Sequence, residues 1–238
     1  MLATDEAIIL AGGFGTRLQS VVRDVPKPLA PVAGRPFLAW LLDQLAGQGV
    51  RRAVLATGYL ADVVESTLGS DWHGMKLVYS REEQPLGTGG AIAKAASAVS
   101  GKRAFVLNGD THLALDYARL GQLAIGGASP ITMALASVDD VGRYGAVMLS
   151  GDRVTGFSEK GGHGPGMINA GVYDIDLASL SAEFPHGPFS FEQDVLVPAA
   201  AKGRVRAFTQ TSRFIDIGIP EDFERAQSMF SQSLQNGA

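Results

Sequence analysis

The chain of 238 residues contains no cysteine. Without thiols it has no disulfide bridges, no cysteine nucleophile and no zinc site with cysteine ligands, and this composition fits a reducing compartment. Histidine is scarce, and its spacing does not match a metal site. We interpret these residues as structural or solvent-facing: His73, His112, His163 and His186.

Long apolar runs and a strong excess of one charge are absent as well. No apolar stretch approaches the roughly 20 residues of a membrane-spanning helix, and residues 1–6 lack the charged and apolar regions of a signal peptide. With 20 basic and 24 acidic residues the net charge is −4, and no basic run is typical of a nucleic-acid-binding surface. We expect a cytoplasmic protein that binds neither membranes nor nucleic acids.

The N-terminal half alternates β-rich runs with helical patterns. Strands are predicted at 7–10, 53–57, 76–80 and 104–107, and helices at 37–48, 61–68 and 88–98. This alternation predicts a mainly parallel, doubly wound sheet with helices on both faces. No stretch is typical of a linker and there is no internal repeat, so we expect a single domain over residues 1–238.

The pattern becomes β-rich after Asp110. Strands are predicted at 131–137, 145–149, 154–157 and 168–173, and we expect them to form a small β-rich region over the C-terminal edge of the sheet, where open α/β sheets bind ligands. The remaining expectations are a helix over 191–201, a strand at 205–208, a helix from Pro220 to about Phe230 and a frayed tail at 231–238. The predicted fold class is α/β, with a Rossmann-like, mixed and mostly parallel central sheet.

The first predicted strand ends in a glycine-rich turn. After Leu10, the glycines Gly12, Gly13 and Gly15 allow a polyphosphate to approach backbone N–H donors closely. Arg17 adds a permanently charged planar fork that suits phosphate oxygens. Neither the P-loop spacing nor the third glycine of a dinucleotide-binding fingerprint is present. The alternative for the turn alone is an ordinary strand-to-helix connection.

A lysine and two aspartates follow this turn in the sequence. Pro26 and Pro28 are expected to hold Lys27 in an extended segment, as a cation that can follow charge developing on a reacting phosphorus. Asp110 comes just after the strand predicted at 104–107, and Asp216, in the apolar segment 214–218, repeats this arrangement. Two carboxylates at strand ends, completed by phosphates and waters, are what Mg²⁺ requires. Either aspartate alone could instead cap a turn.

A second glycine-dense turn covers residues 81–91. A glutamate in it could accept hydrogen bonds from N1–H and N2–H₂ of guanine together, a pair that adenine and cytosine lack, whereas uracil and thymine retain one imide donor. The alternative is a solvated acidic turn. Further along, Glu159, Lys160 and Asn169 have the side chains that sugar hydroxyls and a sugar phosphate require, although each alone is more often a surface residue.

These motifs, in this order, resemble the sugar-1-phosphate nucleotidyltransferase family. The matching blocks span most of the chain, at 10–18, 26–28, 82–91, 107–110, 144–145, 159–160, 169–171 and 216–221. The resemblance implies an enzyme in which a phosphate oxygen of a sugar 1-phosphate attacks the α-phosphorus of a nucleoside triphosphate and releases pyrophosphate. It also implies a nucleotide-binding part at about 1–110 and a sugar-phosphate-binding part at about 111–230.

The resemblance assigns roles to particular residues. It places at the nucleotide Leu10, Gly12, Gly13, Gly15, Thr16, Glu82 and Gly87, with Glu82 facing the base. It makes catalytic Arg17, Lys27, Asp110 and Asp216, with both aspartates holding the Mg²⁺ cofactor. It places at the sugar phosphate Gly145, Glu159, Lys160 and Asn169.

Within the family, the segments 13–25 and 82–90 look most like those of D-glycero-α-D-manno-heptose 1-phosphate guanylyltransferases. The expected partners are therefore GTP and a sugar 1-phosphate, and a homodimer is left open. Mannose-1-phosphate guanylyltransferases and N-acetylmuramate-1-phosphate uridylyltransferases are the alternatives inside the family. A GT-A glycosyltransferase would normally carry Asp-x-Asp, whereas Asp110 is followed by Thr111 and His112. A non-catalytic nucleotide-sensing module should have lost Lys27 or an aspartate of the pair.

Overall fold

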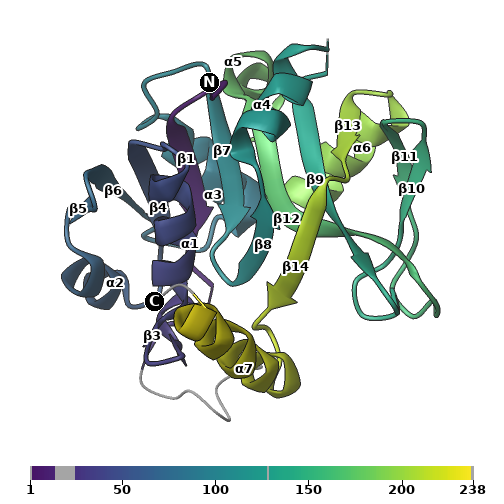
Figure 1. Cartoon of the computed structure of the whole chain (residues 1–238). Helices are drawn as coiled ribbons and strands as arrows, with labels where there is room; N and C mark the ends of the chain where they lie inside the picture. Colours follow the sequence, from purple (N-terminus) through teal and green to yellow (C-terminus); the bar gives the residue numbers. More distant parts are fainter. Residues whose placement is uncertain (1, 14–24, 128, 237–238) are drawn as a thin grey trace.

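The computed structural model describes residues 2–13, 25–127 and 129–236. In this part of the chain, ten strands form one sheet in the order β10-β11-β13-β9-β12-β7-β1-β4-β6-β5 (Figure 1). Its parallel portion consists of β7 (Arg103–Asn108), β1 (Glu6–Leu10), β4 (Arg52–Thr57) and β6 (Met75–Arg81), and β5 (Asp71–Trp72) adds an antiparallel edge. The helices between these strands are α1 (Phe37–Gly47), α2 (Ala61–Leu68) and α3 (Gly87–Ala96).

The strands after Asp110 extend this sheet. The long strand β12 (Gly166–Asp176) runs antiparallel to β7 and pairs on its other side with β9 (Ile131–Val138). Beyond β9 lie β13 (Val205–Phe208), β11 (Arg153–Phe157) and β10 (Val147–Ser150). The α/β class with a mixed central sheet is confirmed. The expectation that these strands lie over the sheet edge is corrected, because β12 is buried along most of its length and has a partner strand on each side.

Alternate residues of β1 divide the core into two layers. Ala7 and Ile9 belong to the hydrophobic cluster that contains side chains of α1, α2, α4 (Tyr117–Ile125) and α7 (Pro220–Asn236). Ile8 faces the cluster formed with α3, α5 (Leu177–Leu180), η4 (Phe191–Leu196) and α6 (Val197–Ala201). Helices therefore cover both faces of the sheet, as the alternating pattern predicts, and Figure 1 shows α1, α4 and α7 on the near face.

Two small ribbons position functional segments. The strand β8 (Thr111–Leu115) pairs with β14 (Thr211–Asp216), and this pairing sets Asp216 opposite Thr111. The hairpin of β2 (Pro31–Val32) and β3 (Arg35–Pro36) follows the short 3₁₀ helix η2 (Lys27–Leu29). A second 3₁₀ helix, η3 (Ser181–Glu183), follows α5. The register of β8 and β14 brings the chain after β14 to the end of β7.

Two helix predictions need correction. The helix expected over 191–201 is divided into a π-helical turn, η4, and α6, because Pro198 has no N–H to continue the regular ladder and the N–H of Val197 donates to Glu192, five residues back. The last helix continues past Phe230 to Asn236, so most of the expected tail is helical. No glycine or proline interrupts the chain between Ser231 and Asn236. The elements β8 and α4 were not predicted.

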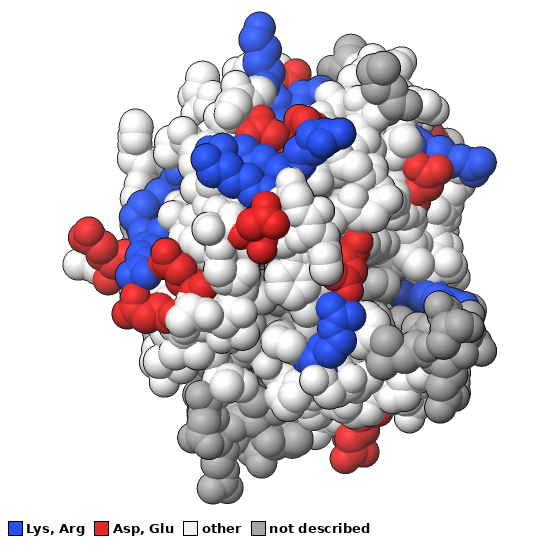
Figure 2. Space-filling view, turned by 60° about the vertical axis from the view of Figure 1, so that its left-hand side comes forward, with Lys and Arg blue, Asp and Glu red and all other residues white. Residues whose placement is uncertain are grey.

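Charges of both signs are mixed on one face of the molecule. Figure 2 shows acidic and basic side chains beside one another on the face formed around α2 and β6. Within the described ranges, no helix has both the length and the apolar character needed to cross a bilayer.

Candidate active site

Three strand ends converge where the glycine-rich turn begins. The N–H of Ala11 donates to the carbonyl of Ala56 at 2.8 Å, and the N–H of Gly109 donates to Leu10 at 2.8 Å. At Gly12, a Cβ atom would lie 3.0 Å from Glu82 Oε1 and 3.3 Å from a backbone nitrogen. Glycine favours this close approach, because a Cβ atom here would be tight against the neighbouring segments.

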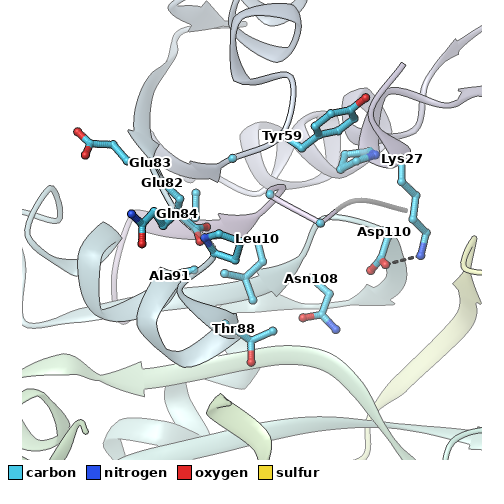
Figure 3. Close-up of a pocket in the computed structure, with 17 residues that line it drawn as sticks. Leu10, Lys27, Tyr59, Glu82, Glu83, Gln84, Thr88, Ala91, Asn108 and Asp110 are labelled. Carbon is cyan, nitrogen blue, oxygen red and sulfur yellow. Dashed lines mark hydrogen bonds and ion pairs between the residues drawn. The ribbon is translucent and has the colours of Figure 1, made fainter. Parts of the chain in front are cut away.

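A cavity of about 550 Å³ opens above these strand ends. We call it the larger cavity. Its wall includes seven of the predicted site residues: Leu10, Gly12, Gly13, Lys27, Glu82, Gly87 and Asp110. The predicted residues Gly15, Thr16 and Arg17 lie outside the described residues. Figure 3 shows Glu82 and Gln84 at one end and Lys27 with Asp110 at the other, with Leu10 and Asn108 between them.

Lys27 lies between the two aspartates. Its Nζ is 2.5 Å from Asp110 Oδ2 and 3.8 Å from Asp216 Oδ1, and its side chain is only 14% exposed. The extended segment expected around Lys27 is wrong. Instead, Leu29 and Ala30 donate to the carbonyls of Pro26 and Lys27 and close a 3₁₀ turn, which the fixed φ of Pro28 tolerates at its start. The expectation of a positioned cation nevertheless agrees with this arrangement.

The carboxylates of Asp110 and Asp216 lie close enough to affect each other, and such a pair attracts a cation. Burial, followed by the negative charge of Asp110, raises the pKa of Asp216, while Lys27 and Arg143 oppose this effect. Among the described residues, no group of three or more acidic, histidine or cysteine side chains could hold a metal. Mg²⁺ commonly binds one or two carboxylates and takes its remaining ligands from phosphates and waters. The two aspartates fit that donor set.

A smaller cavity of about 210 Å³ adjoins the larger one. The two share Leu10, Thr88 and Asn108 in their walls. Besides Leu10, three predicted residues line the smaller cavity: Lys160, Asn169 and Asp216. Asp110 and Lys27 therefore belong to one cavity and Asp216 to the other, so the charged cluster stands where the two meet.

Two predicted sugar-binding residues lie off the wall of the smaller cavity. Glu159 is exposed. Gly145 has a φ of +82° and directly follows Tyr144 in the sequence, and Tyr144 does line the cavity. Asn169 is positioned by its own contacts, because its Oδ1 accepts from the N–H of Gly171 at 3.0 Å and its amide bonds the Tyr173 hydroxyl. The roles of these residues toward a sugar stay predictions.

Glu82 organises the second glycine-dense turn as well as lining the larger cavity. Its backbone N–H donates to Thr57 at 2.7 Å, and its Oε2 accepts from the N–H of Leu86 at 3.0 Å. Its other carboxylate oxygen lies beside Gly12. The carboxylate is thus held at the start of α3, at the end of the cavity opposite Lys27 (Figure 3).

Several wall residues escaped the sequence analysis. Asn108 and Thr88 line both cavities although they lie inside recognised blocks, and Tyr59 lines the larger cavity with 48% of its surface exposed. Arg143 contacts Asp216 from 73 positions away. The place of Asn108, between a buried strand and Asp110, could have indicated that it lines the site. For Arg143, nothing in the local sequence indicates its partner.

Comparisons with known proteins agree with this geometry. The family described as "Nucleotidyl transferase" matches residues 6–233. The D-glycero-alpha-D-manno-heptose 1-phosphate guanylyltransferase of Aneurinibacillus thermoaerophilus is 41% identical over 93% of this chain and 96% of its own. The mannose-1-phosphate guanylyltransferase of Mycobacterium tuberculosis is 35% identical over 94% of this chain and 64% of its own. HddC from Yersinia pseudotuberculosis, solved with GMP-PN, superposes with a TM-score of 0.84 at 39% identity, covering 97% of this chain and 100% of that one.

Proposed function

The chain belongs to the nucleotidyl transferase family, and we propose that it transfers GMP from GTP to a sugar 1-phosphate. The acceptor that we propose is D-glycero-α-D-manno-heptose 1-phosphate, so that the products are GDP-heptose and pyrophosphate. This specificity rests on the similarity to the heptose 1-phosphate guanylyltransferase of A. thermoaerophilus over nearly the whole length of both chains.

The observation that carries the reaction type is the charged cluster between the two cavities. A nucleotide in the larger cavity would extend from Glu82 at its base to Lys27 at its α-phosphate. A sugar phosphate in the smaller cavity would approach the same point past Lys160 and Asp216. Two substrates that meet at one cation are arranged for direct transfer between them.

The reaction then needs no covalent enzyme intermediate. A phosphate oxygen of the sugar 1-phosphate forms a bond to the α-phosphorus while the bond from that phosphorus to the bridging oxygen of pyrophosphate breaks. Lys27 neutralises the charge that develops on the α-phosphate, and the cavity walls align the attacking and leaving oxygens. Asp110 and Asp216 would hold Mg²⁺, which supplies additional neutralisation of phosphate charge when bound.

Two alternative substrate specificities differ from this proposal in the nucleotide base or in the sugar. A mannose 1-phosphate acceptor is the alternative suggested by the mannose-1-phosphate guanylyltransferase of M. tuberculosis, which is 35% identical to this chain. Uridylyl transfer to N-acetylmuramate 1-phosphate would keep the same mechanism, because uracil retains an imide donor for Glu82. The carboxylate of Glu82 favours guanine, which offers two donors on one edge.

The deciding experiment measures pyrophosphate release with Mg²⁺ for each pairing of GTP, UTP, CTP, dTTP and ATP with heptose, mannose, glucose and N-acetylmuramate 1-phosphates. We expect strong turnover with GTP and the heptose phosphate. Turnover confined to UTP and N-acetylmuramate 1-phosphate would overturn the specificity and keep the mechanism. No release with any pair would reject the enzyme and support a nucleotide-sensing module.

A further inference from the structure

A row of alternating charges runs from the end of β7 to α7. Each member contacts the next in the order Asp110, Lys27, Asp216, Arg143, Asp222 and Arg225. The first three form the charged cluster described above. The last three were not recognised in the sequence, and they connect that cluster to a helix on the outside of the molecule.

Arg143 is the central link of this row. Its Nη2 donates to Asp216 Oδ2 at 2.8 Å and its Nη1 donates to Asp222 Oδ2, so one planar guanidinium bridges two carboxylates. The three side chains are largely buried, with exposed fractions of 27% for Arg143, 22% for Asp216 and 9% for Asp222. A lysine could not reproduce the bridge, because its single nitrogen lacks the two-pronged geometry.

The turn that carries Arg143 and the helix that carries Asp222 are each held in place by further contacts. The turn is closed by the N–H of Tyr144 donating to Val141 at 2.9 Å, and the Arg143 guanidinium lies over the Tyr144 ring, 4.9 Å from the centroid. Asp222 lies in the first turn of α7, where the helix dipole favours a carboxylate.

The helix α7 is anchored in turn to the segment that follows Lys27. The Gln227 amide accepts from the N–H of Ala33 at 2.8 Å and donates to the carbonyl of Pro31 at 2.7 Å. Phe230 of the same helix packs against Trp40, with ring centroids 4.7 Å apart. Asp222 therefore has a fixed place relative to Lys27 as well as to Arg143.

These contacts determine the orientation of the Asp216 carboxylate. Its Oδ2 is held by Arg143, and its Oδ1 accepts from the N–H of Gly218 at 2.7 Å and faces Lys27. We propose that Arg143 is a positioning residue that orients Asp216 for the phosphate-bound cation, and that Asp222 acts on the reaction through Arg143. The inference rests on the proposed function, in which Asp216 holds Mg²⁺.

Charge and position make opposite predictions for this arginine. As a nearby positive charge it would repel a cation, so its removal should strengthen cation binding. As a positioning residue, Arg143 should strengthen cation binding. Without its guanidinium, the Asp216 carboxylate would have to be ordered each time a cation binds. Arg143→Lys keeps the charge and removes the bridge, so it isolates position from charge.

The test compares wild type with Arg143→Lys, Asp222→Ala and the double variant. Binding of Mn²⁺ is measured by electron paramagnetic resonance with a non-hydrolysable GTP analogue, alongside kcat and KM for the sugar phosphate. We expect each single variant to lose about 10- to 100-fold in Mn²⁺ affinity and in kcat. The double variant should lose no more than the worse single variant, because Asp222 acts through Arg143.

The matched control is Arg225→Gln, which removes the outer partner of Asp222, 3.1 Å away and 61% exposed, without touching Asp216. It should leave affinity and turnover unchanged. Wild-type affinity in Arg143→Lys, or additive losses in the double variant, would overturn the proposal. If Arg143→Lys does not fold, Asp222→Ala decides the question by the same measurement. A wild type inactive on every substrate pair refutes the proposed function instead, a result separate from these binding data.

Discussion

A Cβ atom on Gly87 would lie 2.4 Å from the carbonyl oxygen of Phe189. These residues, about a hundred positions apart, join the start of α3 to the segment before η4, and the N–H of Gly89 donates to the same carbonyl at 3.0 Å. With φ of +71° at Gly87, both the backbone and the contact require glycine.

We therefore expect Gly87→Ala to destabilise the fold and to distort the wall of the larger cavity. Gly203→Ala is the matched control, since Gly203 has φ of +67° with nothing within 4 Å of a Cβ atom. The difference between the two variants in urea unfolding should be about 1–3 kcal/mol, the usual cost of overpacking. Equal losses in both would show that only the backbone conformation matters.

Lys27→Ala should lower kcat about 100- to 1,000-fold, because a preorganised charge at the reacting phosphate is removed from a site with little solvent. Steady-state kinetics by pyrophosphate release measures the loss. The exposed Lys102 provides the control, and Lys102→Ala should retain wild-type rates. Wild-type kcat in Lys27→Ala would refute the catalytic assignment.

Glu82→Gln should lower kcat/KM for GTP roughly 10- to 100-fold and reduce the preference over UTP, because one charged acceptor for the guanine edge is lost. The glutamine oxygen can still accept from the N–H of Leu86, so the turn should survive. Glu83 also lines the larger cavity, but Figure 3 shows its carboxylate directed away from Glu82, so Glu83→Gln should preserve the preference. A GTP preference unchanged in Glu82→Gln would place base recognition elsewhere.

Lys160 lines the smaller cavity, whereas its neighbour Glu159 does not. Lys160→Ala should raise KM for the sugar 1-phosphate about 10- to 100-fold, because a charge-assisted contact with phosphate is lost. Glu159→Ala should have a smaller effect on KM, since Glu159 does not line the cavity. The opposite order would mean that the bound sugar moves the segment 158–161 inward.

Asp174 provides a stability prediction away from the site. It is fully buried, its Oδ1 accepts from Arg103 Nε at 2.9 Å, and its Oδ2 has no hydrogen-bond partner among the described residues. Burial raises the pKa of Asp174 to about 6 against the partial compensation of Arg103. Between the unfolded pKa of about 4 and this value, the folded state binds more protons than the unfolded state.

This group therefore favours the folded state below about pH 4, and its contribution is lost as pH rises through 6. The loss is about 3 kcal/mol at most over the window. Urea unfolding of wild type and Asp174→Asn at pH 4.5, 5.5 and 6.5 should show a shallower decline in the variant. Parallel curves for the two proteins would contradict the assignment.

The convergence of Asp110 and the glycine-rich turn was predictable because each follows a recognisable strand. The conformation around Lys27 was not, because its flanking prolines indicated an extended segment and the chain forms a 3₁₀ turn there. Parallel strands bring their carboxyl ends to the same edge, so sequence order alone indicates which segments meet there. The same reasoning predicted the helices on both faces.

Other features depend on long-range pairing that no local pattern reveals. The strands after Asp110 have the same composition whether they lie over the sheet or extend it, and only the pairing of β12 with β7 decides between these arrangements. Arg143 looks like a surface arginine until the fold brings Asp216 and Asp222 to it. The division of the helix near Pro198 was readable, because proline in a helix interior removes a donor.

The pairing of β7 with β12 also separates the scaffold of this protein from its specificity. One hydrogen-bonded sheet runs beneath both cavities. The charged residues expected to contact base and sugar phosphate, Glu82 and Lys160, lie on the connecting segments 82–90 and 158–161, whereas Asn169 lies on β12 itself. An engineer could exchange either segment without altering a strand register. Under the proposed function, the segments that contact the donor nucleotide and the sugar phosphate could therefore be changed independently on a common frame.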